Sequence, residues 1–224
     1  MNDTGDNTWG HLASTSQFGS LVDANNHQYI EKDDIRSEKY KKYSHASHCM
    51  LYAKNDSKVF DIYKCRATIL MHLRFDGLIG FPGGLVDDGE DFVHAVNREL
   101  REEIKLDTVK YPIQEEHHMV SHVHESTKLC LHFFAREIEL KDLCSIEKTC
   151  LSAPDYGEEV LGTFRVPLYT MGDGLRGFPA FLSNSFVGNA RDQLLHSLKI
   201  LGIMTAAELS AAVTASKEVL KNKK

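Results

Sequence analysis

The chain has 224 residues, which is enough for one sizeable hydrophobic core and too few for two full domains. Its formal net charge of -6 argues against broad electrostatic adhesion to nucleic acid, which needs clustered Lys and Arg. No apolar run approaches the roughly 20 residues of a membrane-spanning helix, and no charged-then-apolar leader opens the sequence. We therefore expect a soluble intracellular protein with no membrane partner.

The N-terminal residues differ in composition from the remainder. Residues 1 to about 40 are rich in Asn, Asp, Ser, Gly and His, and their few apolar residues show no period. Such a segment cannot bury enough apolar surface to offset its ordering entropy. We predict a flexible tail over 1–40, a folded domain over 41–215 and a lysine-rich tail over 216–224.

Between these tails, strand-like and helix-like segments alternate. β-Branched and aromatic runs indicate strands, and apolar residues at helical spacing indicate helices. Segments 107–127 and 171–180 are interpreted as loops, and 77–84 as a glycine-punctuated turn. Strands are predicted at 48–53, 59–75, 128–137 and 158–169, and helices at 91–104, 140–151, 189–203 and 205–222. This order, without repeats, predicts a single α/β domain.

The cysteines are dispersed along the chain. They form no Cys-x-x-Cys pair, and their number is odd. This pattern fits reduced, mostly buried thiols better than a disulfide framework or a zinc site. The cysteines are Cys49, Cys65, Cys130, Cys144 and Cys150.

Acidic residues are concentrated in the predicted helix at 91–104. Glu102 and Glu103 lie three and four residues after Glu99, so both neighbour it on one face beside the apolar stripe, where like charges destabilise a helix. Arg98 can pair with Glu102 at i+4. The pattern alone leaves two interpretations open: a solvated surface, or a site for a divalent cation such as Mg²⁺, which takes oxygen ligands. In the second case the glycine turn before the helix permits close approach and a backbone carbonyl ligand.

The spacing of six residues carries a resemblance to a known family. The sequence matches the Nudix box, G-x5-E-x7-R-E-U-x-E-E-x-G-U, in which U is aliphatic. One position departs, because Lys105 stands where the family has its last glycine, and we expect it to end the helix less sharply. The matching positions are Gly84, Glu90, Arg98, Glu99, Glu102 and Glu103.

Further stretches between about 43 and 201 resemble the snoRNA-decapping branch of the Nudix family. They include "HASHCMLYA", "ILMHLRFDGLIGFPGGLVD" and "GFPAFLSNSFVGNARDQLL". A catalytically silent relative in this branch, syndesmos, lacks the intact glutamate array that this chain has. The resemblance implies a Nudix fold, an α/β/α sandwich around a mixed sheet, with the box forming a loop–helix–loop.

The resemblance also implies roles for particular residues. Mg²⁺ or Mn²⁺ would be held by the Gly83 carbonyl, Glu99 and Glu103, with Glu102 assisting and His122 as a further ligand. Arg98 would orient the carboxylates, and Glu103 or Glu159 would accept a proton from water. The nucleotide would be bound by His48, Arg74, Phe81 and Gln193, with Arg74 on a phosphate or base carbonyl, Phe81 against a purine, and the other two at base edges.

We therefore expect a metal-dependent pyrophosphohydrolase acting on nucleoside diphosphate-linked substrates. One possibility is decapping of snoRNA or mRNA, which releases a methylated guanine nucleotide and 5′-monophosphate RNA. Another is hydrolysis of inosine or deoxyinosine diphosphate, and the alternative from a different class is a catalytically weak RNA-binding adaptor like syndesmos. The resemblance further implies a homodimer in the nucleus or nucleolus, with a possible cytoplasmic fraction.

Overall fold

The computed structural model describes residues 26–222. The strands are β1 (His27–Ile30), β2 (Ser44–Val59), β3 (Tyr63–Arg74), β4 (Ile79–Gly80), β5 (Gly83–Leu85), β6 (His118–His124), β7 (Leu129–Glu137) and β8 (Val160–Arg165). The α-helices are α1 (Phe92–Ile104), α2 (Leu140–Thr149), α3 (Phe178–Leu182), α4 (Ala190–Ile200) and α5 (Ala206–Asn222). Among these residues, no helix has both the length and the apolar character needed to cross a membrane.

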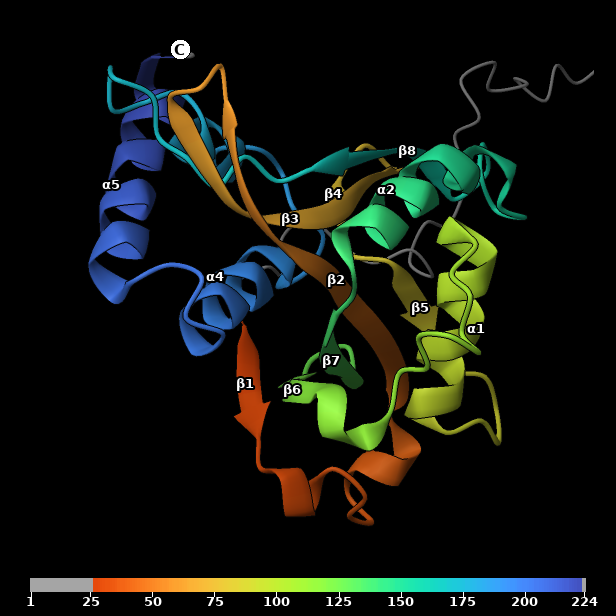
Figure 1. Cartoon of the computed structure of the whole chain (residues 1–224). Coiled ribbons are helices and arrows are strands. Elements are labelled where there is room, and N and C mark those ends of the chain that lie inside the picture. Colours follow the sequence, from red (N-terminus) through yellow and green to blue (C-terminus); the bar gives the residue numbers. More distant parts are fainter. Residues whose placement is uncertain (1–25, 223–224) are drawn as a thin grey trace, which may run out of the picture.

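The strands form one mixed sheet. Its main order is β1-β6-β7-β2-β3-β4, with β5 on β2 and β8 on β3. β2 and β7 run parallel, and the other pairs between named strands are antiparallel. Figure 1 shows α1 and α2 on one side of the sheet and α4 and α5 on the other. The predicted α/β/α sandwich around a mixed sheet is confirmed.

Two apolar clusters fill the space between the sheet and its helices. On one face, Leu51 and Phe134 pack with residues of α1 and α2. On the other face, Met50 and Phe133 pack with residues of α3, α4 and α5. Because successive side chains of a strand point to opposite faces, neighbouring residues of β2 and β7 serve different clusters.

The sheet divides where β2 changes partner. β2 pairs with β5 from Ala46 to His48, and it pairs with β3 only from Tyr52 onward. The turn that carries Phe81, Pro82 and Gly83 lies where these strands diverge. This division places the glycine turn, the C-terminal half of β3 and α1 around one region.

The predicted N-terminal tail is too long. Residues 26–40 are folded, because β1 adds a strand beside β6 and because Ile30 and Ile35 are buried against Val123 and Cys130. Local composition did not reveal this segment, since its stability comes from strand pairing and from two isolated apolar residues. Residues 1–25 lie outside the described residues.

Two other boundaries also need correction. β6 lies inside 107–127, which was interpreted as a loop. The segment from 216 onward was assigned to a tail outside the folded domain, but it belongs to α5, which buries Ser216 at 1% exposure and ends at Asn222, where the predicted helix at 205–222 also ends. The helix extends because this stretch is rich in Lys, Glu and Leu, which favour helices.

Candidate active site

Helix α1 is fixed at both ends by capping interactions. Asp91 is the N-cap, and its side chain accepts a hydrogen bond from the Val93 amide at 2.9 Å. At the C-terminus Lys105 adopts the left-handed conformation, with φ 57° and ψ 39°, and the Leu106 amide donates to the Leu100 carbonyl at 3.0 Å. The expectation of a less sharp end is therefore wrong, because a lysine holds the conformation that glycine usually supplies.

Both glycines before α1 are required by close packing. A Cβ on Gly83, where φ is 136°, would lie 2.2 Å from the Ser47 carbonyl oxygen. A Cβ on Gly84 would lie 2.7 Å from the Glu99 carboxylate. No side chain fits at either position, so the turn approaches β2 on one side and the carboxylates of α1 on the other.

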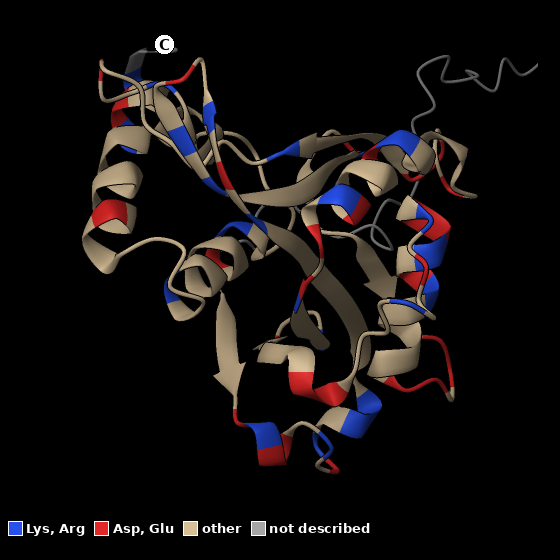
Figure 2. Ribbon diagram, viewed as in Figure 1, with Lys and Arg blue, Asp and Glu red and all other residues tan. Residues whose placement is uncertain are grey.

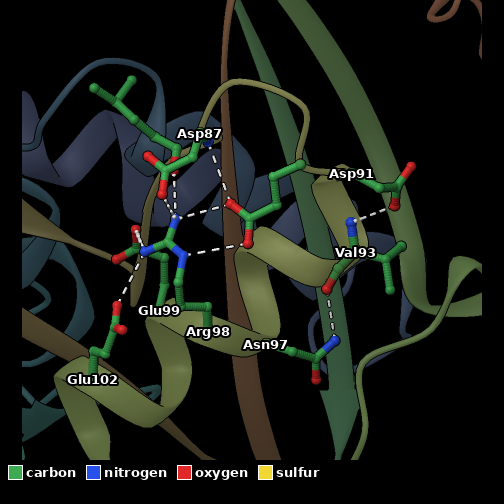
Figure 3. A network of polar contacts seen from close by, with 9 residues as sticks. Asp87, Asp91, Val93, Asn97, Arg98, Glu99 and Glu102 are labelled. Carbon is green, nitrogen blue, oxygen red and sulfur yellow. Dashed lines mark hydrogen bonds and ion pairs between the residues drawn. The ribbon is translucent and has the colours of Figure 1, made fainter.

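Arg98 organises the acidic residues. Its Nη1 donates to Glu99 at 2.7 Å and to Glu102 at 3.0 Å, while Nη2 donates to Glu90 at 3.1 Å and to the Leu85 carbonyl at 3.0 Å. Figure 3 shows the guanidinium at the centre of this network. In Figure 2 the surrounding acidic residues follow the loop before α1 and continue along the helix, interleaved with arginines. The structure thus places Arg98 where it orients these carboxylates.

Two of the box glutamates are buried, at 8% exposure for Glu99 and 2% for Glu103. Burial raises the pKa of Glu99 to about 7, although Arg98 opposes the shift. Burial also raises the pKa of Glu103 well above its ordinary value, opposed by the hydrogen bond that the Gly83 amide donates at 2.6 Å. Buried carboxylates are costly when ionised, and a divalent cation would offset that cost.

The donor set fits a divalent cation. The site combines buried carboxylate oxygens with a glycine turn that a Cβ would fill, and hard cations prefer oxygen ligands. Among residues 26–222, no three His, Cys, Asp or Glu side chains are already arranged around one point as ligands. Here Glu99 accepts a hydrogen bond from Arg98, and Glu103 accepts one from the Gly83 amide.

Glu159 lies near the same carboxylates. It precedes β8, and its backbone carbonyl accepts a hydrogen bond from the Phe75 amide at 3.0 Å. Burial is the largest cause of the raised pKa values of Glu99 and Glu103, and the negative charge of Glu159 makes a smaller contribution in the same direction. Both predicted candidates for the general base, Glu103 and Glu159, are therefore near each other.

Arg74 joins this region from the end of β3. It donates to Asp76 at 3.0 Å. Burial and, to a smaller extent, the charge of Arg74 together lower the pKa of His48 to about 4. The positive charge of Arg74 also lowers the pKa of Glu103, although this effect is smaller than that of burial. The predicted phosphate clamp, Arg74, thus lies near both the box and His48.

Phe81 and Gln193 are buried rather than presented at a surface. The Phe81 ring is 1% exposed and packs on Phe133 with centroids 4.8 Å apart. It follows an apolar strand end and completes the core. Its contact with a purine stays a prediction. Gln193 on α4 is 3% exposed, and its amide nitrogen has no hydrogen-bond partner among the described residues. That free donor fits a contact with a ligand.

The structure does not bring His122 to the box carboxylates. It lies on β6, and two strands, β7 and β2, separate β6 from β5. Burial lowers the pKa of His122, and the charges that act on it belong to His27, His196 and Asp192. Its neighbours are therefore on β1 and α4 rather than on α1.

Sequence reasoning missed His72, which is 0% exposed on β3. Its Nε2 lies 4.0 Å from Oε1 of Glu103. Burial lowers the pKa of His72 to about 3, with a further contribution from Arg74, so the imidazole is neutral. The available signal was a single histidine inside the apolar run "ILMHL", two residues before Arg74.

Comparisons with known proteins agree with this geometry. The family described as "Nudt16-like: U8 snoRNA-decapping enzyme-like" matches residues 45–204. A "U8 snoRNA-decapping enzyme" of Homalodisca vitripennis is 54% identical over 181 residues, covering 81% of this chain and 97% of the relative. A "Tudor-interacting repair regulator protein" of Homo sapiens is 40% identical and covers 79% of this chain and 82% of the relative. Among solved structures, a mutT/nudix family protein from Listeria innocua is 15% identical with a TM-score of 0.42, covering 71% and 94%.

The fold and the box define a Nudix hydrolase, a class of enzymes that use divalent cations. The match over residues 45–204 shows that the chain belongs to the Nudt16-like family.

Proposed function

We propose that the protein is a metal-dependent pyrophosphohydrolase that removes the cap from RNA, with snoRNA or mRNA as substrate. The observation that carries the proposal is the intact, buried pair Glu99 and Glu103 beside Arg98 and Arg74. The 54% identity to a protein named for U8 snoRNA decapping supports capped RNA as the substrate class. Inosine and deoxyinosine diphosphate are the competing substrates that the same site could hold.

In this reaction the oxygen of a water molecule bonds to one phosphorus of the pyrophosphate bridge, and the bridging P–O bond breaks. The products are a methylated guanine nucleotide and 5′-monophosphate RNA. When bound, Mg²⁺ or Mn²⁺ offsets the charge of the phosphates and lowers the pKa of the attacking water.

Residues of this chain supply the remaining functions. The Gly83 carbonyl, Glu99 and Glu103, assisted by Glu102, would hold the cation. Glu103 or Glu159 accepts the proton of the water. Arg74 would contact a phosphate, since a guanidinium matches phosphate oxygens with two donors.

The environment of Glu103 supports its proposed role as a proton acceptor. Burial raises the pKa of its carboxyl, so the group holds a proton more readily than an exposed glutamate. Arg98 restrains the neighbouring Glu99 and Glu102, which keeps the acidic array in place.

The test is a turnover panel in Mg²⁺ and in Mn²⁺ that compares capped RNA with free inosine diphosphate. We expect metal-dependent release of the methylated guanine nucleotide, with kcat/KM for capped RNA above that for inosine diphosphate. The reverse order would assign the enzyme to free nucleotides. Absence of turnover on both, with retained RNA binding, would favour the adaptor function instead.

We also propose that the protein forms a homodimer and acts in the nucleus or nucleolus, with a cytoplasmic fraction. The support for both is the sequence resemblance alone. Size-exclusion chromatography with light scattering tests the dimer, and imaging of the tagged protein tests the location.

A further inference from the structure

His72 is a buried polar side chain without a hydrogen-bond partner among residues 26–222. It is 0% exposed, and neither Nδ1 nor Nε2 forms a hydrogen bond with another described residue. Its neighbours along β3, from Ile69 to Leu73, are apolar. Leaving a buried polar group without a hydrogen bond is destabilising, so a partner from outside the chain would explain its presence.

The free side of the ring faces the box. Nε2 of His72 lies 4.0 Å from Oε1 of Glu103, which is too long for a hydrogen bond. The other oxygen of Glu103 already accepts from the Gly83 amide at 2.6 Å. Nε2 of His72 and Oε1 of Glu103 thus lie opposite each other in the interior without forming a hydrogen bond.

The backbone of Gly80 lies close to Nε2 of His72. A Cβ on Gly80, the β4 residue paired with His72, would lie 3.6 Å from Nε2 and 3.1 Å from Cδ of Arg74. The positive charge of Arg74 is balanced there by three hydrogen bonds to Asp76, at 3.0, 3.2 and 3.3 Å. The positive charge of Arg74 therefore does not prevent a cation from binding beside Nε2.

We propose that His72 supplies a nitrogen ligand to a divalent cation that Glu103 also binds. The proposal deepens the proposed function and rests on it, since it concerns the cation of the same site. Bonds from such ions to nitrogen and oxygen ligands are about 2.1 Å long, so two ligands of one ion lie at most about 4.2 Å apart. The observed 4.0 Å is within that limit.

The ligand type has a consequence for metal choice. Imidazole suits Mn²⁺, Co²⁺ and Zn²⁺ better than Mg²⁺, which prefers oxygen. A nitrogen ligand beside carboxylates therefore gives this site a preference for Mn²⁺ over Mg²⁺. A histidine with only a packing role would not affect the two ions differently.

The test uses Mn²⁺ alone with the full chain. Pulsed electron paramagnetic resonance of bound Mn²⁺ detects coupling to the ¹⁴N nucleus of a coordinated imidazole, and titration calorimetry gives the affinities for Mn²⁺ and Mg²⁺. Two variants, His72→Gln and His72→Asn, guard against misfolding of either one. His122→Gln is the matched control.

We expect ¹⁴N coupling in the wild type and in His122→Gln, and its loss in the His72 variants. Loss of a ligand should weaken Mn²⁺ binding at least about tenfold, while the affinity for Mg²⁺ falls by a smaller factor. Persistence of the coupling in a folded His72 variant, or its loss in His122→Gln, would overturn the proposal.

Two further outcomes separate this inference from the proposed function. Wild-type protein that binds Mn²⁺ without any ¹⁴N coupling overturns the role of His72 and leaves the hydrolase intact. Wild-type protein that binds neither Mn²⁺ nor Mg²⁺ overturns both.

Discussion

Glu103 is deeply buried and has a proposed role in catalysis. A substitution that keeps its hydrogen bond therefore tests the chemical role apart from the effect on folding. Glu103→Gln keeps an oxygen that can accept from the Gly83 amide but removes the negative charge. We expect turnover of the preferred substrate to fall at least about 10²-fold, because proton-transfer and metal-binding roles contribute that much.

The control for this substitution is Glu218→Gln on the exposed face of α5, which should leave turnover unchanged. Steady-state kinetics of both purified variants gives the answer. A Glu103→Gln enzyme with more than about a tenth of wild-type turnover would contradict both proposed roles of this carboxylate.

Gly84 tests whether the carboxylates need their close packing. In Gly84→Ala the new Cβ would lie 2.7 Å from the Glu99 carboxylate, which Arg98 holds in place, so Glu99 must move. We expect Mn²⁺ affinity, measured by calorimetry, to fall about tenfold or more. Gly172→Ala is the control, since nothing lies within 4 Å of that Cβ. Equal affinities in the two variants would show that the turn does not position Glu99.

Some site residues were predictable from sequence, and others were not. The box residues Glu99, Glu103 and Arg98 share one helix, so spacing alone places them together. Phe81 and His72 lie near the ends of strands that approach the box residues only in the folded protein. Their burial depends on packing against β2, β4 and β7, which no local pattern encodes.

At the scale of elements, the end of α1 is strained. Lys105 has φ 57°, a conformation that costs a residue with a Cβ about 1–2 kcal/mol. Its Nζ donates to Ser152 at 2.9 Å, so replacing the lysine removes two effects at once. A pair of variants separates them.

We expect Lys105→Gly to be more stable than Lys105→Ala by about 0.5–1 kcal/mol, after the greater unfolded-state entropy of glycine is counted. Both variants lose the Ser152 contact equally. Urea unfolding measures the difference. Equal stabilities would mean that the left-handed cap relaxes when the lysine is gone.

Apolar periodicity explains which helices and strands could be predicted from the sequence. α1, α2 and β7 carry clear apolar periods, and their predicted positions are confirmed. β1 and β6 do not, because four of their eleven residues are histidines and because β1 lies at the edge of the sheet. Their pairing with each other, between residues such as Tyr29 and His122, is a long-range interaction.

At the scale of the whole molecule, three of the described histidines are buried in the sheet: His72, His124 and His132. A hydrogen-bonded chain runs from His118 through Ser121 and His132 to His45, with contacts of 2.8 Å each, and ends 3.0 Å from the Tyr40 carbonyl. The carbonyl can only accept, so in the neutral chain His45 accepts from His132, which accepts from Ser121. His132 is therefore held neutral, and burial lowers its pKa to about 3.

These pKa shifts predict acid sensitivity of the metal-free protein. Burial lowers the pKa of His48, His72 and His132 to about 4, 3 and 3, so below pH 6.5 the unfolded chain binds protons that the folded chain does not. Each such group costs up to about 1.4 kcal/mol per pH unit. Glu99 and Glu103 act oppositely: their raised pKa values give stability that is full below about pH 4.5 and is lost as pH rises, for Glu99 through about 7.

Between pH 6.5 and 4.5 these three histidines oppose the two glutamates, and His117, His118 and His122, whose pKa values burial also lowers, add to the histidine side. The net effect is therefore a loss of stability as pH falls. We expect the free energy of unfolding, measured with urea in a chelator, to fall gradually over that range and more steeply below pH 4.5, where both glutamates are protonated in either state. A cation that keeps the two carboxylates ionised cancels their opposing effect, so saturating Mn²⁺ should make the loss between pH 6.5 and 4.5 steeper. His132→Asn, which leaves the metal site intact, should reduce the slope in both conditions. A free energy of unfolding that stays constant from pH 6.5 to 4.5 would show that these histidines are protonated in the folded protein.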